Sequence, residues 1–303
     1  MYFQGESGYQ HLLKETLRNG ERKTTRNGVV QSIFGCMINF KEIATSFPLI
    51  TTKKMFFRGI VEELLWFLRG STNALELRQK KIHIWDGNST REYLDSIGLD
   101  YPEGELGPIY GWQWRKFGKD YADRKLADVA DAADAKGIDQ IKYILEELMK
   151  DTNSRRAVLS GWNPTDLQKM ALPPCHILYI FHKGSKGLSC QMTLRSSDLF
   201  LGLPFNIAST ALLTQIFAHV LHIPANEITL SICDAHIYEE HTQQVDKQID
   251  TDAFDLPTVA IKKEAPDISS SVDEKIRWIE SLVFEDFELS NYKSGVSLPA
   301  VMK

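Results

Sequence analysis

One cysteine stands directly after two prolines and directly before a histidine, in the segment ALPPCH at residues 171–176. Proline fixes its own φ, lacks a backbone donor and pushes the preceding residue toward an extended conformation. We therefore expect a stiff approach that holds Cys175 at a fixed point where a strand begins. These six residues allow two interpretations: a positioned reactive thiol, or a buried structural thiol, since free cysteine is among the most buried residue types.

Arginines stand at expected strand ends and turns rather than on ordinary helix faces. Arg26 lies in TTRNG, Arg195 lies in LRSSD, and the pair Arg155 and Arg156 lies in NSRRAVL. Planar guanidinium groups suit bidentate binding of phosphate. A surface ion pair would explain any one of them, but two adjacent arginines at a strand start both need a partner. The pattern favours a site for an anionic group.

Hydroxyl, carboxylate, amide and imidazole groups follow in three short motifs. LRSSD continues past Arg195, GLPFN opens a long apolar helix, and CDAHIY ends an expected strand. Because strand side chains alternate between faces, His236 and Tyr238 should project from the same face. The polar residues of these motifs are Ser196, Ser197, Asp198, Asn206, Asp234, His236 and Tyr238.

Composition excludes some classes of protein. The chain has 303 residues, of which 43% are hydrophobic and 25% charged, with a formal net charge of −5. A slightly acidic chain is not built as a general nucleic-acid or membrane binder, so grouped arginines must hold any anionic ligand. We expect no membrane span, because no apolar run approaches the roughly 18–20 residues that a span needs.

The cysteines lie far apart and form no CxxC motif; they are Cys36, Cys175, Cys190 and Cys233. This spacing argues against a zinc site and against a disulfide scaffold. We therefore expect no metal ion and a reducing compartment, the cytoplasm.

Hydrophobic periodicity predicts the elements that must position these groups. The third expected helix is apolar on nearly every face, so it should lie buried at the centre of the fold. The expected helices are 57–70, 137–151 and 204–223, and the expected strands are 28–40, 155–162, 175–184, 187–198 and 227–238. Strands and helices do not alternate in a regular βαβ pattern. We therefore predict a single α+β domain in which a mixed sheet packs against the central helix.

Two segments stand apart from this domain, which we expect to span residues 6–303. Residues 1–5, MYFQG, resemble the remnant of a protease-cleavable tag and are left out of the fold prediction. Residues 121–137 are rich in alanine and aspartate and are expected to form a surface insertion with some helical character.

Seven stretches of the chain together carry a family resemblance. They are FPLITTKK, EELLWFLRGSTNA, IWDGN, LGPIYGWQWR, SRRAVLSGWNPTDLQKMALPPCH, LSCQMTLRSSDLFLGLPFNIAS and DAHIY. In this order and spacing they resemble the thymidylate synthase family over nearly the whole chain after its first residues. The resemblance implies an α+β domain that dimerises through its sheet. It also implies folate-dependent transfer of one carbon to C5 of deoxyuridylate (dUMP), through a covalent bond from Cys175 to C6.

The resemblance implies catalytic roles. Cys175 matches the nucleophile, and Arg195 is expected close to that thiol and to the substrate phosphate. Glu63 matches a glutamate that organises water and moves protons, and Tyr110 matches a tyrosine associated with removal of the C5 proton. The catalytic residues implied are Cys175, Glu63, Tyr110, Asn206, Arg195 and Asp198.

Asn206 is expected to select the base. Its amide offers a donor and an acceptor, which match the carbonyl oxygen and the N3–H of uracil. Family members that act on cytidylate carry Asp at the matching position, so the resemblance implies dUMP as substrate.

The remaining matches concern ligands. For dUMP they are Arg26, Arg155, Arg156, Arg195, Ser196, Asn206, His236 and Tyr238, with residues 155 and 156 arriving from the other subunit of an obligate homodimer. For 5,10-methylenetetrahydrofolate, the expected co-substrate, they are Trp85, Asn88, Asp198, Leu201, Gly202 and Phe205.

Several positions depart from the family pattern. Thr193 and Leu194 precede the phosphate-binding arginine where Tyr-Gln is usual, and Thr210 stands where Tyr is usual. The chain closes on Met302 and Lys303, whereas typical members close on a short apolar tail that folds over the folate. A poorer seal would admit water to the site.

Three outcomes therefore stay open. If water is excluded, hydride from tetrahydrofolate reduces an exocyclic methylene to methyl, giving thymidylate and dihydrofolate. If water enters, the product is 5-hydroxymethyl-dUMP with tetrahydrofolate, as in some phage relatives, so a bacterial or phage-infected cell is the expected host. The third outcome is an inactive nucleotide-binding homologue, which the presence of the nucleophile, Asn206 and the arginines disfavours.

Overall fold

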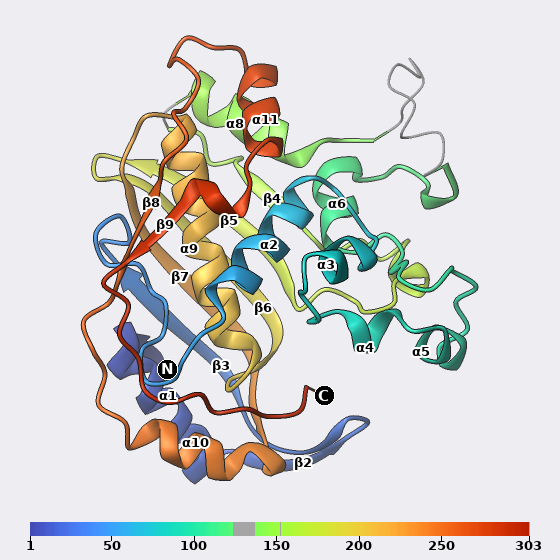
Figure 1. Ribbon diagram of the computed structural model, residues 1–303, viewed down its shortest axis with the longest axis vertical. Coiled ribbons are helices and arrows are strands. Elements are labelled where there is room, and N and C mark those ends of the chain that lie inside the picture. The colour runs from blue at the N-terminus through green and yellow to red at the C-terminus, as the bar shows by residue number, and fades with distance from the viewer. Residues whose placement is uncertain (124–136, 152, 303) are drawn as a thin grey trace.

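A mixed seven-stranded sheet forms the centre of the protein (Figure 1). The structure is a computed structural model that describes residues 1–123, 137–151 and 153–302. Strand order is β1-β3-β7-β6-β5-β4, and β2 also pairs with β3; β1 with β3 and β6 with β7 run parallel, and the other pairs antiparallel. The strands are β1 (Tyr2–Gln4), β2 (Glu21–Thr25), β3 (Gly28–Lys41), β4 (Val158–Ser160), β5 (His176–Gly184), β6 (Gly187–Asp198) and β7 (Ala225–Tyr238).

Helix α9 (Gly202–Val220) is the core helix, and it packs on β6 and β7. Its apolar residues occupy nearly every face, so burial on all sides is the arrangement that removes them from water. By length and composition it is the one helix among the described residues that could cross a membrane, but 78% of it is buried inside the protein. The length and composition of α9 correct the expectation that no apolar run approaches the length of a span. Its burial identifies it as the core helix.

The other helices surround this core. Helix α2 (Phe57–Leu68) contacts both α9 and α6 (Tyr110–Lys116), and Figure 1 shows α3 to α6 grouped on one side of the sheet. The remaining helices are α1 (Gly5–Asn19), α3 (Leu75–Gln79), α4 (Asp86–Ser89), α5 (Arg91–Ser96), α8 (Gln140–Lys150), α10 (Thr242–Ile249) and α11 (Val272–Glu280). The smaller elements are the strand pair β8 (Thr258–Ile261) and β9 (Phe287–Ser290), with the 3-10 turns η1 (Tyr121–Asp123), η2 (Leu167–Lys169), η3 (Glu239–His241) and η4 (Phe284–Asp286).

Most of the sequence predictions of the fold are confirmed. The expected helices correspond to α2, α8 and α9, and the sheet is mixed, as an α+β class requires. The strand expected over 155–162 is shorter, Val158–Ser160, because a tight turn from Arg156 O to Val158 N precedes it. Of the expected insertion at 121–137, residues 124–136 lie outside the described part of the chain.

The first residues correct a prediction. Tyr2–Gln4, left out as a tag remnant, form β1 and pair with residues 37–39 of β3. Phe3 is 8% exposed and its ring packs edge-on against His11, 5.5 Å away between centroids, so burial of this aromatic holds the strand in place. The origin of these residues, and the domain limits at residues 6 and 303, stay predictions.

Candidate active site

The two prolines before Cys175 hold a guanidinium beside its thiol. Arg195, near the end of β6, donates from Nη2 to the carbonyl of Pro173 at 2.9 Å and from Nε to that of Pro174 at 2.8 Å. Its backbone N–H donates to the carbonyl of Cys175 at 2.9 Å, and its Nη2 lies 3.9 Å from the Cys175 Sγ. The carbonyls of the two prolines therefore hold the Arg195 guanidinium beside the Cys175 thiol.

Opposing effects set the protonation of Cys175. Burial raises the pKa of the thiol, whereas the Arg195 charge and a hydrogen bond with Tyr110 lower it. The Tyr110 hydroxyl accepts from the Cys175 N–H at 2.8 Å, and burial raises the pKa of this phenol well above its usual value. The phenol keeps its proton and is fixed next to Cys175.

His176, the other neighbour of Cys175, plays a different part. Its ring stacks on Tyr110 at 4.2 Å between centroids, and its Nδ1 lies 2.8 Å from the Tyr179 hydroxyl. Burial lowers the pKa of His176 to about 3, so the imidazole is neutral at physiological pH. Because it is stacked on the phenol and enclosed, His176 supports Tyr110 and is not the base for Cys175.

Glu63, on α2, is a carboxyl that is hydrogen-bonded by Trp85 and has a raised pKa. Trp85 donates from Nε1 to Glu63 Oε1 at 2.8 Å, and the Trp85 ring lies 5.9 Å from that of Tyr110. Burial raises the pKa of Glu63 to about 7, against the smaller lowering effect of the Trp85 hydrogen bond. A carboxyl with a pKa near 7 can both accept and release a proton at neutral pH.

A cationic cavity of about 280 Å³ lies on the other side of Arg195. It brings together five of the residues expected to bind dUMP, from the β2–β3 turn and the ends of β6 and β7. Parallel pairing sets Ser196 opposite Asp234, and β3 pairs Val30 with Tyr238. The lining residues are Lys23, Thr25, Arg26, Asn27, Val30, Arg195, Ser196, Asp234, His236 and Tyr238.

Asp234 orients His236 in this cavity. The Asp234 carboxylate accepts from His236 Nδ1 at 3.0 Å and from the Ser32 hydroxyl at 3.2 Å. A carboxylate only accepts, so His236 Nδ1 carries a proton. The hydrogen bond from His236 lowers the pKa of Asp234. The sequence analysis named Asp234 but gave it no role. Its position two residues before His236, on the same strand face, could have indicated this contact.

The residues expected to line the folate site fall into two groups. One is Trp85 beside Glu63, with Asn88 following on α4. In the other, Asp198 Oδ1 accepts from the N–H groups of Phe200 and Leu201, at 2.8 and 3.2 Å, just before Gly202 opens α9 with Phe205 in its first turns. That the two groups line one folate cavity stays a prediction.

Lys53 is a buried cation that the sequence analysis did not single out. It is 5% exposed, donates to the carbonyl of Phe200, and lies 3.8 Å from that ring's centroid. Burial lowers the pKa of Lys53 to about 7, while the negative charge of Asp198 opposes this effect. The run TTKK within an apolar stretch was its only signal in the sequence.

The remaining predicted residues differ in placement. Asn206 is half-buried on α9, and within the described part of the chain no protein group bonds its side-chain amide. Arg155 and Arg156 are exposed and lie outside the lining of the cavity. Their place in a site of another subunit stays a prediction.

A family model described as thymidylate synthase matches residues 7–303. The chain belongs to the thymidylate synthase family.

Curated relatives agree with this membership. The chain is 44% identical over 296 residues to a putative bifunctional dihydrofolate reductase-thymidylate synthase of Oryza sativa subsp. japonica, covering 96% of this chain and 56% of the relative. It is 44% identical over 289 residues to a bifunctional dihydrofolate reductase-thymidylate synthase of Zea mays, covering 95% and 52%. With thymidylate synthase 1/2 of Encephalitozoon cuniculi it shares 41% identity over 288 residues, covering 95% and 93%.

The chain spans about half the length of the bifunctional relatives that it matches. All the relatives named here are eukaryotic, so they do not support the expected bacterial or phage-infected host. A cytoplasmic location stays a prediction.

In this member of the thymidylate synthase family, Thr210 replaces the usual Tyr and is accommodated by hydrogen bonds to nearby residues. Thr210 is 1% exposed, and its hydroxyl donates to the carbonyl of Asn206 at 2.7 Å. The Tyr179 phenol also hydrogen-bonds Thr210. Leu194 is fully buried in the core, and nothing in the structure explains Thr193.

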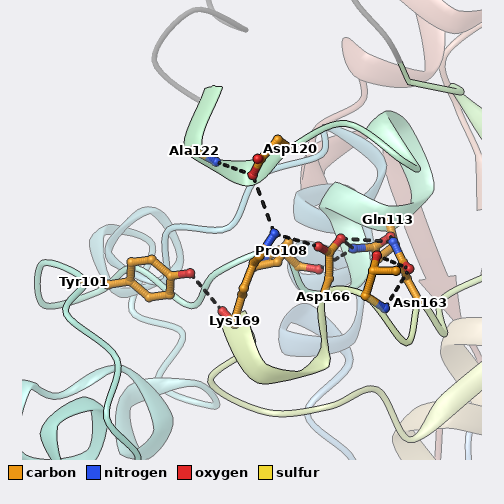
Figure 2. Close-up of polar contacts among 9 residues, drawn as sticks. Tyr101, Pro108, Gln113, Asp120, Ala122, Asn163, Asp166 and Lys169 are labelled. Carbon is orange, nitrogen blue, oxygen red and sulfur yellow. Dashed lines mark hydrogen bonds and ion pairs between the residues drawn. The ribbon is translucent and has the colours of Figure 1, made fainter.

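A buried polar network supports the segment that leads to Cys175 (Figure 2). Asp166 Oδ2 accepts from the amide of Gln113 at 2.9 Å and from that of Asn163 at 3.0 Å, while Lys169 Nζ lies 3.2 Å from Asp166 Oδ1. Gln113 is on α6, the helix that Tyr110 opens. The network therefore ties the helix of Tyr110 to the chain that carries Cys175.

The C-terminal segment of this family member lies along residues 51–54. Gly295 N–H donates to Thr51 O at 2.8 Å, and Lys54 N–H donates to Val296 O at 3.2 Å. Further on, the carbonyl of Val301 lies 3.0 Å from His241 Nε2. Lys303 lies outside the described residues, so the expectation of a poorer seal stays untested.

Proposed function

We propose that the protein converts dUMP and 5,10-methylenetetrahydrofolate to thymidylate and dihydrofolate. The observation that carries the proposal is the position of Arg195, which lies 3.9 Å from the Cys175 thiol and also lines the cationic cavity. One guanidinium thus touches the nucleophile and the expected phosphate site. Family membership and relatives named thymidylate synthase support the same activity.

The cavity suits a nucleoside monophosphate. Arg26, Arg195 and Ser196 would bind the phosphate through charge-assisted hydrogen bonds. His236, oriented by Asp234, and Tyr238 would bind the ribose 3′-hydroxyl. Asn206 would read the carbonyl oxygen and N3–H of uracil, because its amide is left without a protein partner in the described residues.

The residues around Cys175 fit covalent catalysis. The Cys175 thiolate would add to C6 of uracil, forming the S–C6 bond and moving an electron pair into an enolate that makes C5 nucleophilic. Tyr110 lies where a phenol can help take the C5 proton, and Glu63 can move protons near the uracil carbonyl and the folate nitrogen. Methylenetetrahydrofolate supplies the one-carbon unit and then the hydride that reduces it, and leaves as dihydrofolate. Loss of the C5 proton would first break the bond between the transferred carbon and the folate nitrogen, leaving an exocyclic methylene and tetrahydrofolate. Hydride from that tetrahydrofolate would then reduce the methylene to methyl as the S–C6 bond breaks, which releases thymidylate, dihydrofolate and the Cys175 thiolate.

We also propose a homodimer in which Arg155 and Arg156 reach the site of the partner. Both are exposed and neither lines the cavity of its own chain. Phe34 is 80% exposed on β3 and Ile180 is 40% exposed on β5, so apolar side chains of the sheet are available for an interface. Analytical ultracentrifugation tests the dimer, and mixing a Cys175→Ser chain with an Arg156→Ala chain tests sharing of sites, since hybrid dimers should regain activity.

No observation favours the hydroxymethyl product or the inactive homologue. The relatives named thymidylate synthase favour the methyl product, and the nucleophile, its cation and the cavity are all present.

The deciding experiment mixes the protein with dUMP and methylenetetrahydrofolate and follows dihydrofolate absorbance, with mass spectrometry of the nucleotide. Dihydrofolate and thymidylate in equal amounts are expected. A hydroxymethyl product, or no product from folded protein, would contradict the proposal. Cys175→Ser should lose about 10³-fold or more of the turnover while still binding dUMP by calorimetry.

A further inference from the structure

His241 occupies a buried position between the C-terminal segment and the site. It ends turn η3, just before α10, and is 1% exposed. Its Nε2 lies 3.0 Å from the carbonyl of Val301. A carbonyl only accepts hydrogen bonds, so Nε2 carries the proton and donates it to the C-terminal segment.

The opposite edge of the same ring faces the folate side of the site. His241 Nδ1 is buried without a hydrogen-bond partner and lies 3.9 Å from Asp198 Oδ2. The ring also packs 5.6 Å from Phe200 and 5.6 Å from Tyr238, between centroids. With the ring proton on Nε2, Nδ1 is an acceptor, and the Asp198 carboxylate also only accepts, so the two atoms do not hydrogen-bond. The packing against Phe200 and Tyr238 is what holds this edge of the ring beside Asp198.

We infer that His241 is a positioning residue that fastens the C-terminal segment to the folate side of the site. It binds the Val301 carbonyl through Nε2 and packs against Phe200 and Tyr238, beside Asp198, which precedes α9. The segment is also anchored at Val296 through Lys54. Loss of His241 should therefore release Val301 from this position. This inference rests on the proposed function, because it concerns closure over the folate.

The test is a double-mutant cycle between His241→Leu and deletion of residues 301–303. Each change alone should lower kcat/KM for methylenetetrahydrofolate by about three- to tenfold, the effect of one lost hydrogen bond, with little change in KM for dUMP. The combined variant should be no worse than the deletion alone, because both remove the same contact. His241→Gln, whose amide can still donate to the carbonyl, should recover most of the loss.

His222→Gln is the matched control. His222 Nε2 also lies near a backbone carbonyl, that of Pro266 at 2.8 Å, but it follows the far end of α9 from Asn206. This variant should keep normal kinetics. If His241→Leu does not fold, His241→Asn, whose amide is too short to reach Val301, replaces it in the cycle.

A second readout does not depend on activity. Carboxypeptidase should release the terminal residues faster from His241→Leu than from the unchanged protein or from His222→Gln. Additive losses in the cycle, or an unchanged release rate, would overturn the inference. Failure of the unchanged protein to form dihydrofolate would instead overturn the proposed function, and the release rate would still test the contact.

Discussion

The guanidinium of Arg195 lies 3.9 Å from the sulfur of Cys175 while donating to the carbonyls of Pro173 and Pro174. The diproline thus fixes the cation rather than the thiol alone. Arg195 also lines the cationic cavity and lies 5.8 Å from the ring centroid of Trp162. A phosphate bound in this cavity would interact with the same guanidinium that lowers the thiol pKa. Arg195 would then take part both in substrate binding and in activation of the thiol.

The first prediction concerns this charge. Arg195→Gln removes the cation, so the pKa of Cys175, already raised by burial, should rise further. The thiolate fraction at pH 7.5, and with it the rate of alkylation by iodoacetamide, should fall about tenfold. The measurement is the pH profile of alkylation, with mass spectrometry to assign the adduct to Cys175.

Arg195→Lys is the control for this prediction. It keeps the charge but loses the fork that binds the two proline carbonyls, so its profile should shift less than that of the glutamine variant. Coinciding profiles for the unchanged protein and Arg195→Gln would show that the charge does not control the thiol.

Features that lie within one helix or one sequence motif could be predicted from the sequence, whereas contacts between strands distant in the chain could not. Helix α9 was predictable because its apolar residues extend around the whole helix, and Cys175 with Arg195 was predictable through family motifs. The placement of Lys23 and Asn27 in the cavity was not predictable, because they reach it only when the β2–β3 hairpin pairs beside β7. Such cross-strand register is set by tertiary packing and leaves no local pattern.

Two further contacts could not be predicted for the same reason, because they join segments that are distant in the sequence. The orientation of His236 by Asp234 and Ser32 joins β7 to β3, and the contact of His241 with Val301 joins residues sixty positions apart. Tyr2–Gln4 were missed for a different reason, because a tag-like composition hid a strand whose partner lies in β3.

Base selection gives the second prediction. Asn206→Asp replaces an amide that offers a donor and an acceptor by a group that, when ionised, only accepts. The ratio of kcat/KM for deoxycytidylate to that for dUMP should rise at least about tenfold, since a site that leaves a polar group unpaired rejects the ligand. Product formation from each nucleotide, measured by mass spectrometry, provides the ratio, and an unchanged ratio would place base selection elsewhere.

The third prediction concerns the network of Figure 2. Asp166→Ala removes one of the two acceptors of each buried amide group, because Gln113 and Asn163 keep only their hydrogen bonds to the Pro108 carbonyl and to Gln113 Oε1. The free energy of unfolding should fall by about 2–4 kcal/mol, because each unsatisfied buried donor costs about 1–3 kcal/mol. Urea denaturation followed by tryptophan fluorescence measures this change. Asp120→Ala, which removes an exposed partner of Lys169 and the exposed acceptor of the Ala122 N–H, should lower stability by much less.

The fourth prediction follows from the raised pKa of Glu63. In the folded protein this pKa is about 7, against 4.5 for the ordinary carboxyl. Between these values the folded state keeps a proton that the unfolded state has released, so the Glu63 contribution to stability declines as pH rises from 4.5 to 7. Glu63→Gln keeps an acceptor for Trp85 and removes this penalty. It should therefore stabilise the protein at pH 8 by up to about 3 kcal/mol and lose that advantage toward pH 4.5.

Urea denaturation at several pH values between 4.5 and 8 measures the difference between the two proteins. Glu92→Gln, a change at an exposed glutamate on α5, serves as control and should stay within about 0.5 kcal/mol of the unchanged protein at every pH. The stabilised Glu63→Gln protein should at the same time lose turnover, because its amide cannot exchange a proton. A gain in stability joined to a loss of activity marks a residue kept for chemistry, whereas a gain independent of pH would mean that burial does not raise the pKa of Glu63.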